Sequence, residues 1–155
     1  MKVKEIMNQD YQGIAPSILV KDALKYIANT KEHFLIILED NKPLGVLNNN
    51  DLIKKLAQGV TGETKINKIM KTDILTVNED DDLEVAVDIL GYMQVKQLIV
   101  IDKNNNYRGL LSIYDLATNL LTEKYALDVM LENSYLYKTN IAKSFQKIQT
   151  FVTIL

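Results

Sequence analysis

Two stretches of this 155-residue chain each place a polar side chain three positions before an aspartate. The later stretch, GLLSIYD, ends in Ser112 and Asp115, and the earlier one, GVLNNND, ends in Asn48 and Asp51. Hydroxyl, amide and carboxylate groups can all bind a polar ligand through hydrogen bonds. The same residue types also cap the first turn of a helix, and aspartate is a favoured N-cap whatever the function. A ligand site and structural capping therefore both remain open for these residues.

The sequence lacks the residue groupings that catalysis requires. It contains no cysteine, which excludes disulfides, thiolate catalysis and cysteine-ligated metals. His33 is the single histidine, so no nucleophile–base pair or zinc cluster can be built around it. The acidic run NEDDD lacks the glycine and distal glutamate of a calcium-binding loop and fits the start of a helix instead. We therefore assign no catalytic residue and no metal ligand, and we do not expect an enzyme.

Composition narrows the class of protein further. The chain is 47% hydrophobic and 25% charged, which is typical of a protein with a packed core. Its net charge of −2 argues against a nucleic-acid binder, which needs a basic face. The amino terminus lacks the apolar region of a secretory signal, and no apolar run approaches the roughly 18 residues of a membrane span. We expect a cytoplasmic protein with no nucleic-acid partner and no membrane segment.

The two stretches belong to a longer internal repeat. Segment 3–14 matches segment 66–77 at a shift of 63, and segment 33–52 matches segment 97–116 at a shift of 64. Chance seldom produces an alignment of this length with a slip of one residue, so the chain is a tandem duplication. The polar, glycine-containing segment 58–65 is interpreted as the linker.

Each copy of the repeat shows the pattern β-α-β-β-α. Apolar residues at helical spacing predict helices over about 18–30 and 82–94, and a second helix follows each aspartate. Asp81 as N-cap with Glu84 three residues later predicts a capping box at the start of the helix in the second copy. The short apolar runs that predict strands are 34–38, 44–47, 98–101 and 108–111, each pair preceded by an entry segment, 13–15 or 75–77.

The size of one copy predicts that the two pack together. About 60 residues bury too little surface to be comfortably stable alone. We therefore predict an α/β (α+β) fold of two repeats, residues 1–60 and 61–122, related by pseudo-twofold symmetry. A long C-terminal helix is predicted for residues 123–155.

The helical pattern after the second copy has a heptad-like seam. A helix folded back onto the core and a coiled-coil connector are both open for this segment. Because the sequence ends on apolar seam residues, we expect an output domain after residue 155. The seam residues, at spacings of three and four, are Leu127, Met130, Ser134, Tyr137, Ile141, Phe145, Ile148, Val152 and Leu155.

The ordered set of motifs resembles the tandem cystathionine-β-synthase (CBS) domain pair, or Bateman module. The resemblance covers residues 1–121 and rests on EIM and KIM, on ILTVNEDDDLEVAVDIL and on LIVIDKNNNYRGLLSIYD. It implies a regulatory module that binds an adenine nucleotide between the two repeats and passes binding on to a partner or attached domain. AMP, ADP and ATP are the implied ligands, S-adenosylmethionine is a further candidate, and we expect a homodimer.

The resemblance also assigns roles to residues of the second copy. Asp115 would accept hydrogen bonds from ribose hydroxyls. Ser112 would lie near the ribose or phosphate at a helix N-terminus, where free N–H groups favour an anion. Lys96 and Arg108 are candidate phosphate partners, although an arginine on a strand next to a turn, as Arg108 is, is more often a solvated surface charge. The segment that would contact the base through its backbone and an apolar wall comprises Ile74, Leu75 and Thr76.

The first copy departs from this pattern. At a shift of 64, Glu32 and Leu44 take the positions of the two cations, and neither can neutralise a phosphate. We therefore predict one competent site around the second motif, with the first degenerate or selective for a less charged ligand. The alternative is a ligand-free dimerisation scaffold. The first-copy residues implied for a site are Tyr11, Gln12, Gly13, Asn48 and Asp51.

The glycine of each motif has two open explanations. Gly45 and Gly109 either relieve crowding where chain segments cross or allow a ligand to approach closely.

Overall fold

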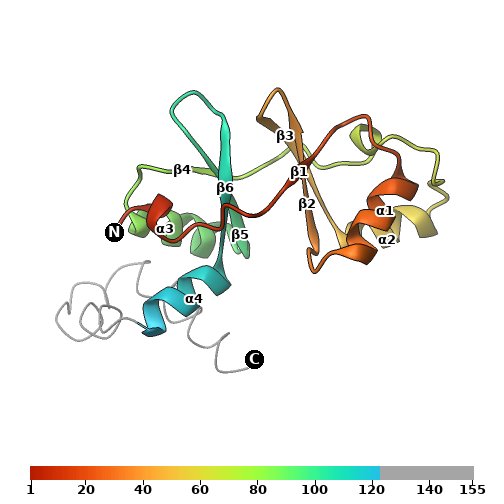
Figure 1. Cartoon of the computed structure of the whole chain (residues 1–155). Helices are drawn as coiled ribbons and strands as arrows, with labels where there is room; N and C mark the ends of the chain where they lie inside the picture. The colour runs from red at the N-terminus through yellow and green to blue at the C-terminus, as the bar shows by residue number, and fades with distance from the viewer. Residues whose placement is uncertain (123–155) are drawn as a thin grey trace. The chain divides into compact units, whose positions relative to one another are not determined.

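The computed structural model describes residues 1–122, so the predicted C-terminal helix and coiled coil of residues 123–155 lie outside the described residues. The chain forms two three-stranded sheets with the strand orders β1-β2-β3 and β4-β5-β6 (Figure 1). Two helices accompany each sheet, so the predicted mixed fold with two β-α-β-β-α repeats is confirmed. None of the helices formed by residues 1–122 is long and apolar enough to span a membrane.

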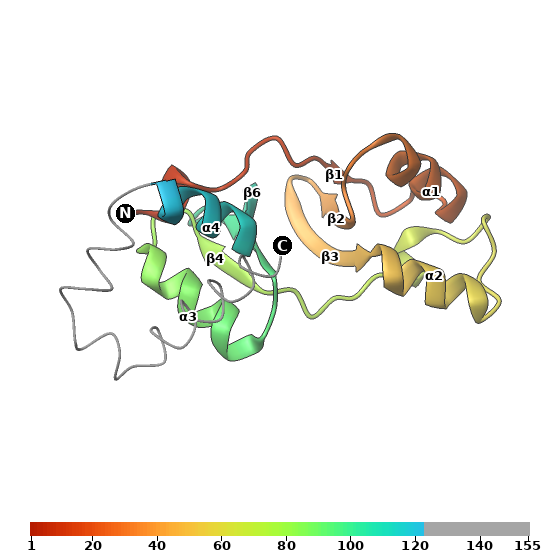
Figure 2. The same cartoon turned by 90° about the horizontal axis from the view of Figure 1, so that it is seen from below.

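The first sheet carries the earlier motif at the end of its last strand. Strand β2 (Phe34–Glu39) lies between β1 (Gly13–Ile14), to which it is parallel, and β3 (Lys42–Asn48), to which it is antiparallel. The central strand is apolar and buried over Leu35, Ile36 and Ile37, as expected for a strand with neighbours on both edges. Helices α1 (Val20–Asn29) and α2 (Asn49–Ala57) lie on one side of this sheet (Figures 1 and 2).

The second sheet repeats this plan around the later motif. Strand β5 (Gln97–Ile101) lies between the parallel strand β4 (Thr76–Asn78) and β6 (Tyr107–Ser112). Helix α3 (Leu83–Met93) precedes β5, and α4 (Ile113–Thr122) continues directly from β6. Both motifs therefore lie where a strand passes without a loop into a helix.

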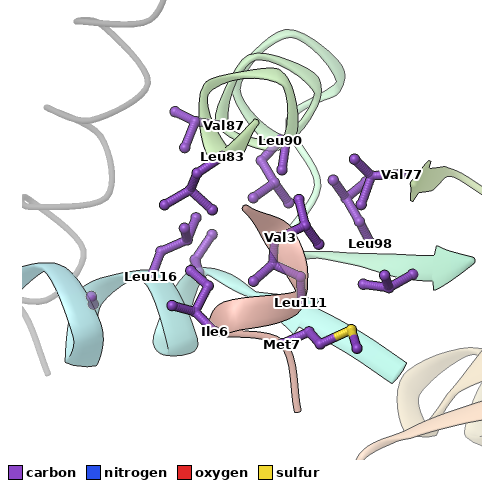
Figure 3. Close-up of a cluster of buried hydrophobic side chains, with 14 residues drawn as sticks. Val3, Ile6, Met7, Val77, Leu83, Val87, Leu90, Leu98, Leu111 and Leu116 are labelled. Carbon is purple, nitrogen blue, oxygen red and sulfur yellow. The ribbon is translucent and has the colours of Figure 1, made fainter. Parts of the chain in front are cut away.

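The opening segment of each repeat packs into the core of the other repeat. The short helix η1 (Val3–Glu5) places Val3 and Ile6 among Leu83, Leu98 and Leu111 of the second repeat (Figure 3). Ile66 and Ile69, from the matching helix η2 (Ile66–Lys68) and its C-cap, belong to the core built on β2, β3 and α1 of the first repeat. Duplicated segments thus make equivalent contacts with exchanged partners.

Matching hydrogen bonds fix the two opening segments. The Val3 N–H donates to the Asp81 carbonyl at 3.1 Å, and the Ile66 N–H donates to the Ile18 carbonyl at 2.9 Å. Each donor and each acceptor is displaced by 63 residues from its counterpart. The compact units of the structure therefore do not coincide with the sequence repeats 1–60 and 61–122. One compact unit includes residues 1–11, 75–104 and 108–122, and the other contains residues 12–74 and 105–107.

The predicted capping box at the start of α3 is wrong. The N-cap is Asp82, one residue later than expected, and no side chain caps its turn. The carboxylate of Asp81 instead accepts the N–H of Asn78 at 3.0 Å and closes the turn after β4. The N–H of Leu83, at the first helical position, is satisfied by the Met1 carbonyl at 3.0 Å, so the exchanged opening segment takes part of the capping role.

The one-residue slip of the repeat lies in the β-hairpin, after the central strand. Gly13 pairs with Ile36 and Thr76 pairs with Ile99, so the central strands still match at a shift of 63. The hairpin of the first repeat turns through two residues, 40–41, whereas residues 102–106 join β5 to β6. The predicted alignment of the central strands at a shift of 64 is therefore wrong by one residue.

Candidate functional site

Ser112 and Asp115 hold each other at the start of α4. The Ser112 N–H donates to Asp115 Oδ2 at 2.7 Å, and the Ser112 hydroxyl donates to the same oxygen at 2.6 Å. In return, the Asp115 N–H donates to Ser112 Oγ at 3.2 Å. This reciprocal pair is a capping box in which serine precedes the helix and aspartate is its third residue.

The position of the aspartates corrects one expectation and leaves room for a ligand. Each aspartate is the third residue of its helix, and the N-cap positions belong to Ser112 and Asn48. Capping and ligand binding are compatible for Asp115, because the capping hydrogen bonds to its carboxylate use Oδ2 alone. No group among residues 1–122 donates a hydrogen bond to its other oxygen, Oδ1, and the residue is half-buried.

Crowding explains the glycine of each motif. A Cβ atom on Gly109 would lie 2.6 Å from the carbonyl oxygen of Asn8, and one on Gly45 would lie 2.7 Å from that of Lys71. Both distances are too short for real atoms. Asn8 and Lys71 each form a short antiparallel bridge with the residue after the glycine, Leu110 or Val46. The glycines therefore admit a crossing backbone, which settles the two explanations in favour of crowding.

The entry segment of the second repeat is partly used by the sheet. Thr76 begins β4 and pairs with Ile99, and the carbonyl of Leu75 accepts the N–H of Ile99 at 3.1 Å. That carbonyl is already occupied by a strand hydrogen bond. Ile74 belongs by its contacts to the compact unit of residues 12–74, apart from Leu75 and Thr76. Of the predicted base-contacting segment, Leu75 and Thr76 thus lie in the same unit as Ser112 and Asp115, and Ile74 does not.

The two predicted cations flank this motif at different points. The carbonyl of Lys96 accepts the N–H of Ile113, the first residue of α4, at 2.9 Å, so Lys96 lies against the start of that helix. Arg108 forms an ion pair with Glu79, at 2.9 Å from Nε to Oε2. The hydrogen bond to Glu79 raises the pKa of Arg108 above its ordinary value, so the guanidinium keeps its charge. We call Thr76, Lys96, Arg108, Ser112 and Asp115 the second half-site.

The first repeat differs most at its aspartate. Asn48 Oδ1 accepts the Asp51 N–H at 2.8 Å, so asparagine replaces serine as the cap. The Asp51 carboxylate is held by Lys71, with 2.8 Å between Nζ and Oδ2. The Asp51 side chain is only 17% exposed, and its carboxylate beside the ammonium raises the pKa of Lys71. We call Gly13, Asn48, Asp51 and Lys71 the first half-site.

The remaining residues of the first repeat support its strands and helix. Gly13 and Asn48 pair with Ile36 and Phe34, on opposite edges of β2. The carbonyl of His33 accepts the N–H of Asn49, the first residue of α2, as the carbonyl of Lys96 does for α4. His33, rather than Glu32, is therefore the counterpart of Lys96. Tyr11 and Gln12, the other residues implied for this site, precede β1, and Tyr11 falls in the other compact unit.

Sequence reasoning missed Lys71 and Glu79. Lys71 follows η2, and its proximity to Asp51 depends on the exchange of opening segments between the repeats. The repeat itself carries one usable signal, because a shift of 63 relates Lys71 to Asn8. Glu79 lies within the acidic run that fits a helix start, and no sequence pattern pairs it with Arg108.

Comparison with known proteins shows the family to which the chain belongs and relatives with a similar sequence. The family model described as the CBS domain matches the chain twice, over residues 3–58 and 66–122. The CBS domain-containing protein YhcV of Bacillus subtilis is 25% identical over 125 residues, which is 80% of this chain and 89% of that protein. A family model that matches both copies accounts for the duplicated motifs.

Solved structures share the fold. The structure of CBSX2 in complex with AMP has a TM-score of 0.67 and 25% identity, and the match covers 78% of this chain and 96% of that one. A CBS domain protein of Pyrobaculum aerophilum complexed with AMP has a TM-score of 0.69 at 18% identity, covering 82% and 95% of the two chains. The cytosolic domain of the magnesium channel MgtE in complex with ATP has a TM-score of 0.66 at 18% identity, covering 76% and 48%.

Proposed function

Because the chain belongs to the CBS-domain family, we propose that it is a regulatory module that senses an adenine nucleotide or a related adenosyl ligand. The second half-site is the proposed binding position. The observation that carries this assignment is the difference between the two carboxylates: within residues 1–122 that of Asp115 is bonded by its own capping box, whereas that of Asp51 is ion-paired with Lys71.

The chemistry of the second half-site suits a nucleoside with a phosphate. A carboxylate whose Oδ1 receives no hydrogen bond from residues 1–122 can accept hydrogen bonds from the hydroxyls of a ribose, and such charged acceptors make strong bonds. The dipole of α4 also favours a negatively charged group near its N-terminus. Arg108 uses Nε for Glu79, and a guanidinium has further N–H donors that can bind an anion.

The comparisons support adenine nucleotides as the first ligands to test. CBSX2, at 25% identity, was solved with AMP, and the two more distant structures contain AMP and ATP. AMP, ADP and ATP are therefore our leading candidates. S-adenosylmethionine remains a candidate because it presents the same ribose hydroxyls to Asp115 without a phosphate.

A thermal-shift panel tests this function. A ligand that binds only the native state stabilises it by RT ln(1 + [L]/Kd), about 2.7 kcal/mol at a hundred times the dissociation constant. We expect at least one of AMP, ADP, ATP and S-adenosylmethionine to raise the unfolding midpoint by several degrees, with cyclic dinucleotides as a comparison. If no compound moves the midpoint, the ligand-free scaffold replaces the sensing function.

Transmission of binding is part of the same proposal. A ligand passes its binding on only if it has different affinities for two arrangements of the protein, and a coupling of about 1–3 kcal/mol is typical. The segment 123–155 follows α4, which begins at the proposed binding position, so we propose it as the route to an output domain or partner. Hydrogen exchange of residues 123–155 with and without AMP tests this, and unchanged exchange would contradict it.

We also propose a homodimer that forms through α3. Val85, Tyr92 and Met93 are 43%, 63% and 55% exposed, and their spacing of seven and eight residues places them on one face of the helix. This apolar face distinguishes α3 from α1. The residues at the matching positions of the first repeat, 63 earlier, are Asp22, Asn29 and Thr30, all polar.

A charged substitution on this face should separate the protomers. We expect the wild-type chain to be dimeric by light scattering and the Tyr92→Lys variant to be monomeric at micromolar concentration, because a lysine ammonium is costly to bury. Ile53→Lys, at a 61% exposed position on α2, is the matched control and should stay dimeric. A monomeric wild type, or a Tyr92→Lys variant with unchanged mass, would contradict the proposal.

A further inference from the structure

Equivalent positions near the two aspartates carry different charges. Residue 8 bridges Leu110, just before Ser112, and residue 71 bridges Val46, just before Asn48. The bridges have the same hydrogen bonds: the N–H and C=O of Asn8 bond Leu110 at 2.8 and 2.9 Å, and those of Lys71 bond Val46 at 2.8 Å each. The backbone thus brings residue 8 to the second half-site and residue 71 to the first in the same way.

The side chains at these positions act differently on the nearby carboxylate. The ammonium of Lys71 lies 2.8 Å from Asp51 Oδ2. The Asn8 amide oxygen accepts the N–H of Asp10 at 2.8 Å, within its own turn, and an asparagine cannot neutralise a carboxylate. The helix-start aspartate is therefore duplicated, and among the ion pairs of residues 1–122 a cation is paired with Asp51 and none with Asp115.

From this difference we propose that Lys71 closes the first half-site by occupying Asp51, and that the residue at position 8 or 71 decides whether a repeat binds an adenosyl ligand. This inference rests on the proposed function. At Asp51 Oδ2 a ribose hydroxyl must compete with the Lys71 ammonium, whereas the groups that bond Asp115 Oδ2 within residues 1–122 are the uncharged N–H and hydroxyl of Ser112. The ion pair thus acts as an intramolecular competitor.

The opposite role of Lys71 must be excluded, because a lysine beside a ribose site can also promote binding by contacting a phosphate. The two roles predict opposite effects for Lys71→Asn, which makes the first half-site resemble the second at this position. If Lys71 competes with the ligand for Asp51, its replacement opens the first half-site. If Lys71 instead binds the phosphate of the ligand, its replacement weakens binding there. The variant should fold, because Asn8 already satisfies the same backbone bridge in the other repeat.

The test is a calorimetric titration with adenosine. Adenosine is the appropriate probe because the counterparts of Lys96 and Arg108 in the first repeat are His33 and Leu44, which offer little to a phosphate. We expect one adenosine per wild-type chain and two per Lys71→Asn chain, with the gained site at least roughly tenfold tighter than any residual wild-type binding there. Lys68→Asn, which changes an exposed lysine of η2, is the matched control and should bind one. Adding Asp51→Ala to Lys71→Asn should remove the gained site.

Several results overturn the proposal and separate it from the proposed function. If Lys71→Asn still binds one adenosine, or binds fewer than the wild type, Lys71 does not close the site. If the wild type binds no adenosine, AMP or ATP, the proposed function itself fails. The ion pair is checked without any ligand, by titrating the Lys71 side chain by NMR. Asp51→Asn should lower the pKa of Lys71, and an unmoved Lys71 pKa would show that no such pair forms in solution.

Discussion

Replacing Asp115 with alanine is expected to weaken adenine-nucleotide binding by about 10- to 100-fold, enough to abolish the thermal shift at moderate ligand concentration. The reason is the loss of a charged acceptor for the ribose hydroxyls, since hydrogen bonds to charged groups contribute roughly 1.5–3 kcal/mol. Isothermal titration calorimetry with AMP measures the change directly.

Two controls separate binding from folding in this experiment. Asp115→Ala also removes one half of the capping box, which costs about 1 kcal/mol of stability, so the unliganded midpoint is measured for each variant. Asp51→Ala removes the equivalent carboxylate of the first repeat and should leave AMP affinity nearly unchanged. A larger loss of affinity in Asp51→Ala than in Asp115→Ala would reverse the assignment of the two half-sites.

The second large effect concerns folding: Ile6→Ala is expected to destabilise the second repeat by about 2–5 kcal/mol. Ile6 is 8% exposed and packs with Leu83, Leu111 and Leu116, although it precedes all of them by more than seventy residues (Figure 3). Truncating a buried isoleucine loses transfer free energy and leaves a cavity. Hydrogen exchange should rise first in β5 and β6, while β2 and β3 stay protected.

Ile69→Ala provides a matched control for this prediction. Ile69 lies 63 residues after Ile6, is also 8% exposed, and belongs to the core of the other unit. Its truncation should raise hydrogen exchange first in β2 and β3. If Ile6→Ala instead loosens β2 and β3, each opening segment packs within its own repeat rather than in the core of the other one.

Much of the fold follows from local patterns in the sequence. Apolar spacing predicts α1 and α3 to within two residues of their observed ends, and the internal repeat predicts both copies of β-α-β-β-α. Such signals are strong because a helix or strand must bury one face, and this constrains residue types at fixed intervals.

Features that depend on distant contacts are not predictable in the same way. The start of α3 differs from its prediction because the Met1 carbonyl, rather than a side chain, satisfies the N–H of Leu83. The predicted counterpart of Lys96 is wrong because residue similarity places the gap before the central strand, whereas the structure places it in the hairpin. Sequence similarity cannot decide between adjacent gap positions when both leave apolar residues aligned.

The candidate site shows the same division between local and tertiary information. The sequence correctly predicts that Ser112 and Asn48 lie at the starts of helices, and both act as caps there. Sequence alignment attributes the difference in charge between the two motifs to Glu32 and Leu44. The difference comes also from Lys71, whose contact with Asp51 exists only because the η2 segment crosses β3 beside Gly45.

An NMR titration of the 15N-labelled chain with AMP tests whether the nucleotide binds at the second half-site. The Ser112 N–H donates to Asp115 Oδ2 and the Asp51 N–H donates to Asn48 Oδ1, so amide signals report on both helix starts. We predict saturable shifts at Ser112, Ile113 and Asp115, with the signals of residues 48–51 nearly unmoved. Saturable shifts confined to residues 48–51, or no shifts at either helix start, would contradict the assignment of binding to the second half-site.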